Sequence, residues 1–314
     1  MSLAIIEVNG LATLQDAGRI GWRKFGVPVS GPMDWFAFRA ANRLAGNDPG
    51  AAAVEIGLGG ITLRALRDCV IAVAGSGYSL SIYIWDFPLW SSYYVRGGWT
   101  IRLDKLDAGM WAYLAVAGGV QTPPTLGSAS TYLRGPFGGL DGRRLQAGDV
   151  LKAGAPPRPL TDLAARSLPT PAQPAYADNP TLDVILGPQD EYFTEESIAA
   201  FLSHEYTLSP ASDRMGYRLE GPALTHRRKA ELLSEGMAMG AIQVPAGGQP
   251  IIMMADCPTT GGYPKIGAVI SADLPLLAQC VPGKSKIRFQ RTTAGKAQKK
   301  YREMMKKLER IVEE

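Results

Sequence analysis

The sequence has few of the side chains that build common metal and nucleophile sites. Its 314 residues include only two histidines, His204 and His226, and neither lies in an H-E-x-x-H pattern. A histidine-rich metal site is therefore excluded, and a catalytic triad that depends on histidine is disfavoured. The G-x-S-x-G pattern of hydrolase nucleophiles is missing as well. In the segment that ends in "PGKSK", Ala278 stands where a phosphate-binding loop needs its first glycine.

Cysteine and long apolar runs are also scarce. The three cysteines, Cys69, Cys257 and Cys280, are far apart and odd in number, so we expect no disulfide framework and a reducing, cytoplasmic location. The start of the chain, "MSLAIIEVNG", lacks a basic region followed by a long apolar core, which argues against a signal peptide. No run of about 20 apolar residues occurs, so no membrane-spanning segment is expected.

The excess of positive charge is small. The formal net charge is +4, and much of it lies near the C-terminus. Neither an aromatic-basic RNA motif nor zinc-finger spacing is present, so a nucleic-acid partner is not expected.

Glycine and proline, in contrast, are abundant. The chain has 36 glycines and 23 prolines, which favours many turns and a strand-rich fold. Seven prolines fall within 153–180, and proline removes a backbone donor, so this stretch is expected to stay outside the sheets. We predict a mainly β protein with an N-terminal β-domain over 1–155, a Pro-rich linker over 156–180 and a C-terminal β-domain over 181–292. A Pro-rich excursion within one domain is the alternative for the linker.

Short segments of the first half return in the same order in the second half. Chance similarity between glycine-rich strand proteins is one explanation, and duplication of a β-domain is the other. The paired segments are "RIGWR" at 19–23 with "RMGYR" at 214–218, "EIGLGG" at 55–60 with "EGMAMG" at 235–240, and "IAVAG" at 71–75 with "IMMAD" at 252–256.

The end of the chain has helical periodicity. Over 293–314, apolar side chains recur on one helical face among lysines, arginines and glutamates. This predicts an amphipathic helix that docks by its apolar stripe, and a partner-binding helix is the alternative.

Three polar, glycine-bearing loops are candidates for chemistry, because short strands do not hold so many glycines without special turns or a close approach to a ligand. They are "LQDAGRIGWRKFGVPVSGPMD" from Leu14, "SPASDRMGYRLEG" from Ser209, and "SEGMAMGAIQVP" from Ser234 together with "TTGGYPKIG" from Thr259.

The stretch "TTGGYPKIG" allows two interpretations. Gly261 and Gly262 can expose backbone N–H groups in a concave turn that binds anions, and Lys265 adds a positive charge. A Gly-Gly turn with a surface lysine is the simpler alternative, and spacing alone favours it.

The charged residues of the other loops also allow a structural interpretation. Asp16 with Arg19, and Asp213 with Arg214, can be ion pairs that pin loops rather than take part in chemistry. Glu235, beside glycine, is either held by backbone donors or has a raised pKa suited to acid–base work. Cys257 is expected to be a small buried side chain rather than a nucleophile.

These segments in their order, with "ILGPQDEYFT" and "TLGSASTY", resemble the family of the C subunit of 5-oxoprolinase, also called allophanate hydrolase subunit 2 or the biotin-dependent carboxyltransferase-like domain. The resemblance runs from about residue 3 to 290. It implies a cyclophilin-like β-barrel fold, a B-type partner subunit of the same general fold and often an A-type subunit. In such a complex, ATP with Mg²⁺ drives the opening of 5-oxoproline to glutamate. Relatives in urea amidolyase form half of a carboxyltransferase site, with biotin on a separate carrier. A regulator that binds a kinase inhibitor is a further known role.

Residues at matching positions become the candidate site by this resemblance, which favours a ligand loop at 259–267. Lys265, Glu235 and Asp16 are the candidate catalytic residues, with Lys265 stabilising negative charge and Asp16 or Glu235 transferring a proton. Arg19 or Arg214 would orient a substrate carboxylate. The candidate substrate-binding residues are Gln15, Arg19, Ser30, Asp34, Ser212, Asp213, Arg214, Gln243, Thr260, Gly261, Gly262 and Tyr263.

The sequence departs from the family pattern at two places. Ala129 stands where the family usually has arginine in G-S-R-S-T, and Cys257 with Pro258 stand where a basic residue often precedes T-G-G-Y. Both changes remove positive charge near the expected site, so they put the usual substrate in question.

Overall fold

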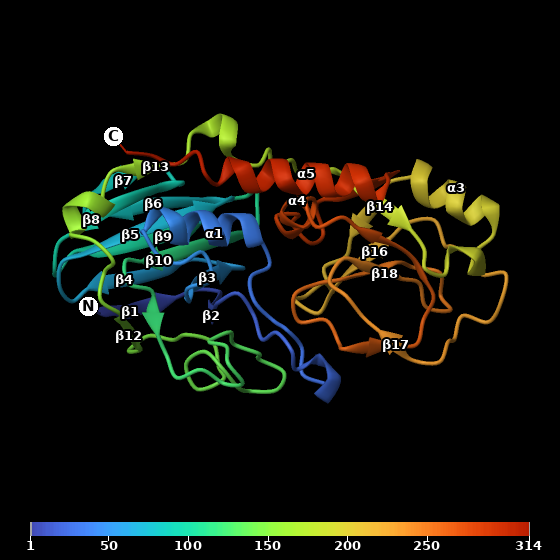
Figure 1. Cartoon of the computed structure of the whole chain (residues 1–314), viewed down its shortest axis with the longest axis horizontal. Helices are drawn as coiled ribbons and strands as arrows, with labels where there is room; N and C mark the ends of the chain where they lie inside the picture. Colours follow the sequence, from blue (N-terminus) through green and yellow to red (C-terminus); the bar gives the residue numbers. More distant parts are fainter. Residues whose placement is uncertain (1, 314) are drawn as a thin grey trace. The chain divides into compact units, whose positions relative to one another are not determined.

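The computed structural model describes residues 2–313, which form two compact units (Figure 1). The first unit contains the chain up to Arg19, residues Ser30–Pro174 and the residues from Lys306 onward. The second unit contains Ile20–Val29 and Ala175–Met305. Among the described residues, no helix is both long enough and apolar enough to cross a bilayer.

The first unit contains two seven-stranded sheets. One sheet has the order β11-β12-β1-β4-β9-β6-β7, and the other has the order β2-β3-β10-β5-β8-β13-β23. The strands of the first sheet are β11 (Val120–Gln121), β12 (Val150–Ala153), β1 (Ser2–Val8), β4 (Ile61–Ala65), β9 (Thr100–Lys105), β6 (Tyr78–Ile82) and β7 (Trp85–Phe87). Those of the second are β2 (Leu11–Gln15), β3 (Ala53–Gly57), β10 (Trp111–Val116), β5 (Cys69–Gly75), β8 (Ser91–Val95), β13 (Arg166–Ser167) and β23 (Val312–Glu313).

The burial pattern of the strands follows from what covers each sheet. Strand β9 alternates between buried and exposed side chains, because only one of its faces meets the core. Strands β5 and β10 are buried along their whole length, since α1 (Trp35–Leu44) packs against both of them. Leucine, isoleucine and valine side chains from both sheets share one hydrophobic core. The first unit is thus a two-sheet arrangement with a helix on one sheet.

The Pro-rich stretch is ordered on the first unit. It contains α2 (Leu160–Leu163), β13 and η2 (Thr170–Ala172). Strand β13 pairs with β8 and β23, which corrects the expectation that this stretch stays outside the sheets. The prolines flank the two paired residues rather than interrupt them, so the ladder keeps its backbone donors. Leu163 is fully buried, which ties the stretch to the first unit up to Pro174.

The second unit contains a closed barrel of seven strands in the order β14-β21-β18-β19-β16-β15-β22. The prediction of a mainly β protein is therefore confirmed, with a barrel in its C-terminal half. The strands are β14 (Thr181–Leu186), β21 (Lys265–Val269), β18 (Ala241–Gln243), β19 (Ile251–Met253), β16 (Gly216–Glu220), β15 (Tyr206–Leu208) and β22 (Lys286–Arg291). A separate two-stranded ribbon joins β17 (Glu235–Gly236) to β20 (Thr260–Gly261).

Short helices complete the second unit. They are η1 (Arg23–Phe25), η3 (Asp190–Tyr192), α3 (Glu195–Ser203), α4 (Leu274–Ala278) and α5 (Ala294–Lys307). The predicted C-terminal helix thus ends at Lys307 rather than at the end of the chain. Leu308, just after it, is fully buried, and two residues of β23 then pair with β13.

Candidate functional site

A buried lysine lies at the centre of the strongest polar cluster in the second unit. The ammonium Nζ of Lys265 lies 2.9 Å from Oε2 of Glu235. The same oxygen accepts a hydrogen bond of 2.9 Å from Nε2 of Gln189. The side chain of Lys265 is 7% exposed, whereas that of Glu235 is 48% exposed. The cluster therefore holds a cation in place and presents its carboxylate partner to solvent.

The backbone fixes Lys265 on a strand rather than on a mobile surface turn. The Lys265 N–H donates to Oε1 of Gln189, and the Gln189 N–H donates back to the Lys265 carbonyl. Lys265 is the first residue of β21 and lies opposite Gln243 of β18, where the register shifts. This corrects the simpler interpretation of the loop as a turn with a surface lysine.

The ion pair sets the protonation state of Glu235. Its pKa is lowered from the ordinary value, mainly by the hydrogen bond from Lys265. Glu235 is therefore a carboxylate near neutral pH, and the alternative of a raised pKa does not hold. As an ionised group it suits the positioning of Lys265 better than the donation of a proton.

The two glycines of the loop are needed for space and not for an unusual backbone hand. Glu235 pairs with Gly261 across the β17–β20 ribbon. A Cβ at Gly261 would lie 2.5 Å from Nε2 of Gln243 and 2.5 Å from Cε of Met237. An anion-binding nest needs successive residues in right-handed and left-handed backbone conformations. Neither Gly261 nor Gly262 has a positive φ, so the expected nest is not formed.

The other loop residues frame the cluster. Nε2 of Gln243 donates to the carbonyl of Tyr263 at 3.3 Å. Thr260 is exposed, and the Tyr263 side chain is partly exposed as well. The structure therefore places six of the predicted residues in the same cluster and loop as Lys265 and adds Gln189, which the sequence analysis did not select. The six are Glu235, Gln243, Thr260, Gly261, Gly262 and Tyr263. Gln189 lies in the "ILGPQDEYFT" segment that resembles the family, and this was the available signal.

A distant arginine borders the same loop. Nη2 of Arg23, on η1, donates to the carbonyl of Thr259 at 3.4 Å. Arg23 also lowers the pKa of Cys257, although burial is the larger effect and the net pKa of this thiol is raised. Arg23 thus brings positive charge to the place before T-G-G-Y where the chain lacks the usual basic residue. Cys257 is 2% exposed, in agreement with a packing role.

In the first unit, Asp16 organises a loop. Its carboxylate accepts hydrogen bonds from the hydroxyls of Ser128 and Ser130, both 2.6 Å, and from the backbone N–H groups of Ala129 and Gly18, at 2.6 and 2.9 Å. All four contacts are made within the loop, so Asp16 suits loop positioning better than proton transfer. At the position of the missing family arginine, Ala129 contributes its backbone to this network.

Arg19 is buried beside the same loop. Its Nε donates to the Thr125 carbonyl at 2.9 Å, and Nη2 donates to the Ser130 carbonyl at 2.7 Å. The guanidinium carbon lies 4.7 Å from the centre of the Phe137 ring. Because Arg19 is fully buried, it presents no accessible edge to a substrate carboxylate, and the structure gives it a role in holding the loop.

The remaining candidates of the first unit are structural or buried. Asp34 caps α1, since its Oδ1 accepts from the N–H groups of Phe36 and Ala37, both at 3.0 Å. Gln15 is fully buried, and its Nε2 donates to Thr131 and Thr13. Ser30 has a φ of 58° and a buried hydroxyl. Among these, only Ser30 combines backbone strain with a buried polar atom, a combination that is enriched at functional sites.

The third predicted loop holds an ion pair with a different partner from the expected one. Arg214 makes a two-point contact with Asp256, with distances of 2.8 and 3.1 Å, and both side chains are 7% exposed. Asp213 instead accepts from the N–H groups of Met215 and Gly216, and Ser212 accepts from that of Arg218. The Nε–Nη2 edge of the Arg214 guanidinium is therefore occupied by Asp256.

The described residues include no group of three or more histidine, cysteine, aspartate or glutamate side chains placed to hold a metal ion. The Lys265 cluster can instead stabilise negative charge. One of the three ammonium donors is used by Glu235, and the cation is desolvated, which strengthens its interaction with a nearby anion.

Comparison with known proteins gives three kinds of match. The family model of the carboxyltransferase domain, subdomain A and B, matches residues 25–291. The C subunit of 5-oxoprolinase from Haemophilus influenzae is 41% identical, over 99% of this chain and 98% of its own, and that of Escherichia coli is 37% identical, over 98% and 97%. The crystal structure of Kluyveromyces lactis urea carboxylase superposes with a TM-score of 0.91 at 29% identity. It covers 99% of this chain, which spans only 30% of that larger protein.

Proposed function

The chain belongs to the family of carboxyltransferase domains, subdomains A and B, and from this premise we propose that it is the C subunit of an ATP-dependent 5-oxoprolinase. The identity to the two bacterial subunits, 41% and 37% over nearly their whole length, supports this choice. A subunit of such a complex would work with B-type and A-type partner chains.

The observation that carries the proposal is the buried Lys265 beside the carboxylate of Glu235. Attack of water on the lactam carbonyl of 5-oxoproline places negative charge on the carbonyl oxygen of a tetrahedral intermediate. The C–N bond breaks when this intermediate collapses and the ring nitrogen takes up a proton. A desolvated ammonium group that is held in position stabilises such charge without reorganising during the reaction. Lys265 would supply this positively charged ammonium group, and Glu235 and Gln189 would position the lysine side chain. Glu235 is a positioning residue in this scheme because its lowered pKa keeps it ionised.

ATP would be used by the complex as a whole. In the proposed reaction, 5-oxoproline, ATP and water give glutamate, ADP and inorganic phosphate. The partner subunits would contribute to the nucleotide site.

A carboxyltransferase half-site is the second candidate. The close structural likeness to urea carboxylase favours it. Such a reaction needs a carboxylated biotin carrier on another chain, and the same lysine would stabilise the oxyanion that forms as the carboxyl group is transferred. Inhibition by avidin separates this candidate from the first, because 5-oxoproline opening does not use biotin.

The test is turnover by the reconstituted complex. This chain would be purified with the B-type and A-type subunits of the same genome, and release of ADP and glutamate from 5-oxoproline would be followed while each subunit is omitted in turn. Loss of turnover without this chain supports the proposal. An absence of turnover with all three folded subunits present would contradict it and direct attention to carboxyl transfer.

A further inference from the structure

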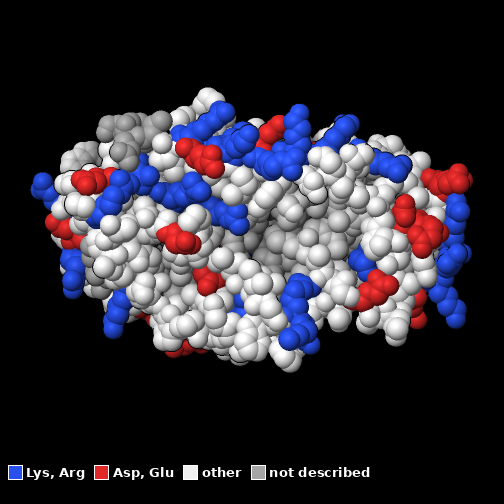
Figure 2. Space-filling view, viewed as in Figure 1, with Lys and Arg blue, Asp and Glu red and all other residues white. Residues whose placement is uncertain are grey.

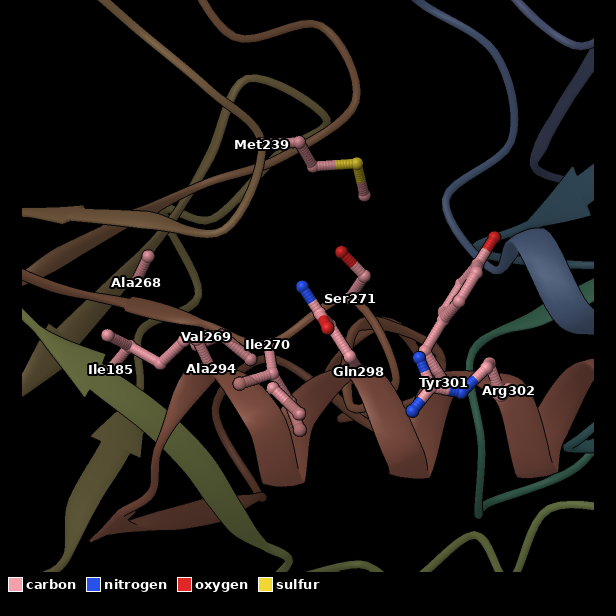
Figure 3. A pocket seen from close by; sticks show the side chains of 11 residues that line it. Ile185, Met239, Ala268, Val269, Ile270, Ser271, Ala294, Gln298, Tyr301 and Arg302 are labelled. Carbon is pink, nitrogen blue, oxygen red and sulfur yellow. The ribbon is translucent and has the colours of Figure 1, made fainter.

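We propose that the second unit has a separate binding groove beside α5 for a small amphipathic carboxylate, a molecule with an apolar body and one negatively charged end. The groove lies between one face of α5 and the residues of β14, β21 and the turn after β21 (Figure 3). Its volume is about 480 Å³, which lies within the range of small-molecule sites. Lys265, Glu235 and Gln189 do not line it, so the groove is distinct from the cluster described above.

An ion cluster helps to hold the helix, whose apolar side chains Tyr301, Met304 and Met305 are only partly buried. No side chain of α5 is buried. Instead, Nζ of Lys300 lies 2.6 Å from Oδ2 of Asp183 and 2.8 Å from Oδ1 of Asp273, whose side chains are 14% and 0% exposed.

The walls of the groove are apolar. On the barrel side, Ile185 of β14 and Val269 and Ile270 at the end of β21 form the lining. On the helix side, Ala294 and Ala297 occupy successive turns, and their short side chains leave the space open. This surface suits an aliphatic or aromatic ligand body.

Polar groups lie toward one end of the same helix face. In Figure 3 the side chains of Gln298 and Ser271 are directed into one space, with Met239 on its opposite side. Tyr301 and Arg302 follow one turn further along the helix. No aspartate or glutamate lines the groove, and Arg302 supplies a cation. This is the arrangement expected for a ligand with a single carboxylate at one end.

The charge of α5 favours the same ligand. The helix carries six lysines and arginines and a single glutamate, Glu303, which lies 4.0 Å from Lys299. Figure 2 shows lysine and arginine side chains gathered along this helix. The two aspartates nearby share Lys300, which compensates one of their two negative charges. A small anion is therefore attracted to the groove, and a small cation is repelled.

The test uses the full chain and calorimetric titration with octanoate, with octylamine as the matched cation. We expect saturable binding of octanoate and none of octylamine. Arg302→Gln should weaken octanoate binding about tenfold, because it removes a charge-assisted contact. The matched control Lys299→Gln removes the same charge from the same helix at a residue outside the groove and should change the affinity less than about twofold. Ala297→Trp should fill the groove and abolish binding.

Three results would overturn the proposal. They are an absence of saturable octanoate binding by the wild type, equal weakening by Arg302→Gln and Lys299→Gln, and undiminished binding by a folded Ala297→Trp variant. If the tryptophan variant does not fold, the comparison of Arg302→Gln with Lys299→Gln is sufficient to test the proposal, since both positions are exposed. Failure here would leave the proposed function intact, because that function rests on Lys265 and on turnover by the complex.

Discussion

Lys265 and Glu235 form an ion pair of 2.9 Å in which the lysine is buried and the carboxylate is half exposed. This asymmetry gives the lysine a fixed position and leaves one side of the pair accessible. It also distinguishes Lys265 from the lysines of α5, most of which extend from an exposed surface.

We expect Lys265→Ala to reduce kcat of the complex about 10²- to 10³-fold, the usual effect of removing one group that stabilises an oxyanion. Turnover with 5-oxoproline and the thermal midpoint would be measured together. Lys296→Ala, on the exposed surface of α5, is the matched control and should retain full activity. A folded Lys265→Ala variant with wild-type turnover in the complex would remove the basis of the site assignment.

The pair of Arg214 and Asp256 is predicted to be a buried structural element. Arg214→Met should lower the free energy of unfolding by about 3–5 kcal/mol, because it leaves the Asp256 charge buried without its partner. The double variant Arg214→Met with Asp256→Leu should be less destabilised than the single variant. Urea unfolding measures both, and additive effects of the two substitutions would contradict the predicted coupling.

Asp16 is predicted to hold the loop that contains Ser128 and Ser130. Asp16→Asn should destabilise the chain by about 1–3 kcal/mol, since the neutral amide cannot accept from all four donors. Hydrogen exchange should accelerate within 125–142 more than elsewhere. Asp213→Asn, at an exposed residue, serves as the control, and an equal response of the 125–142 loop to both variants would count against this role.

Acid should weaken the ion pair of Arg143 with Asp149. The two contacts are 2.8 Å each, and the hydrogen bond from Arg143 is the main reason why the pKa of Asp149 is lowered. Because the folded-state pKa lies below the unfolded value, this stabilisation is present above the unfolded pKa of about 3.9 and is lost as the pH falls through the folded one.

Arg143→Gln should therefore flatten the fall in unfolding free energy between about pH 5 and pH 2, with a loss of about 1 kcal/mol at neutral pH after solvent screening. Arg102→Gln, at the exposed pair with Asp104, should leave the slope unchanged. Parallel pH profiles of the wild type and Arg143→Gln would refute this prediction.

The three cysteines should resist alkylation in the folded chain. All are buried, and burial raises the pKa of Cys69 and of Cys280 to about 12 and also raises that of Cys257. At pH 8 a thiol of pKa 12 is ionised in roughly one molecule in ten thousand, and the thiolate is the reactive form. Mass spectrometry after iodoacetamide treatment should show no labelling without denaturant and three labels in urea. Rapid labelling of native Cys257 would indicate an accessible nucleophile there.

Much of the fold was predictable from local pattern. Glycine and proline content indicated a mainly β protein, and the helical periodicity of 293–314 indicated α5. Local pattern did not show how the strands are shared between two sheets in the first unit and a closed barrel in the second, because that depends on pairing between strands that are distant in sequence. For the same reason, the sequence did not indicate that residues 20–29 belong to the second unit.

The candidate site divides in the same way. The sequence by itself determined the residue types: a lysine after a Gly-Gly pair, glutamate beside glycine, and the two arginines of the echoed "R-x-G" segments. Only the tertiary structure decided their partners. Lys265 contacts Glu235 and Gln189, which lie on other strands and loops. Arg19 donates hydrogen bonds to backbone carbonyls, and Arg214 forms an ion pair with Asp256. Charge and polarity are local properties of a residue, but burial and the identity of a partner arise from contacts between distant parts of the chain. Those contacts gave Lys265 a half-exposed carboxylate as its partner and enclosed the two arginines in the interior.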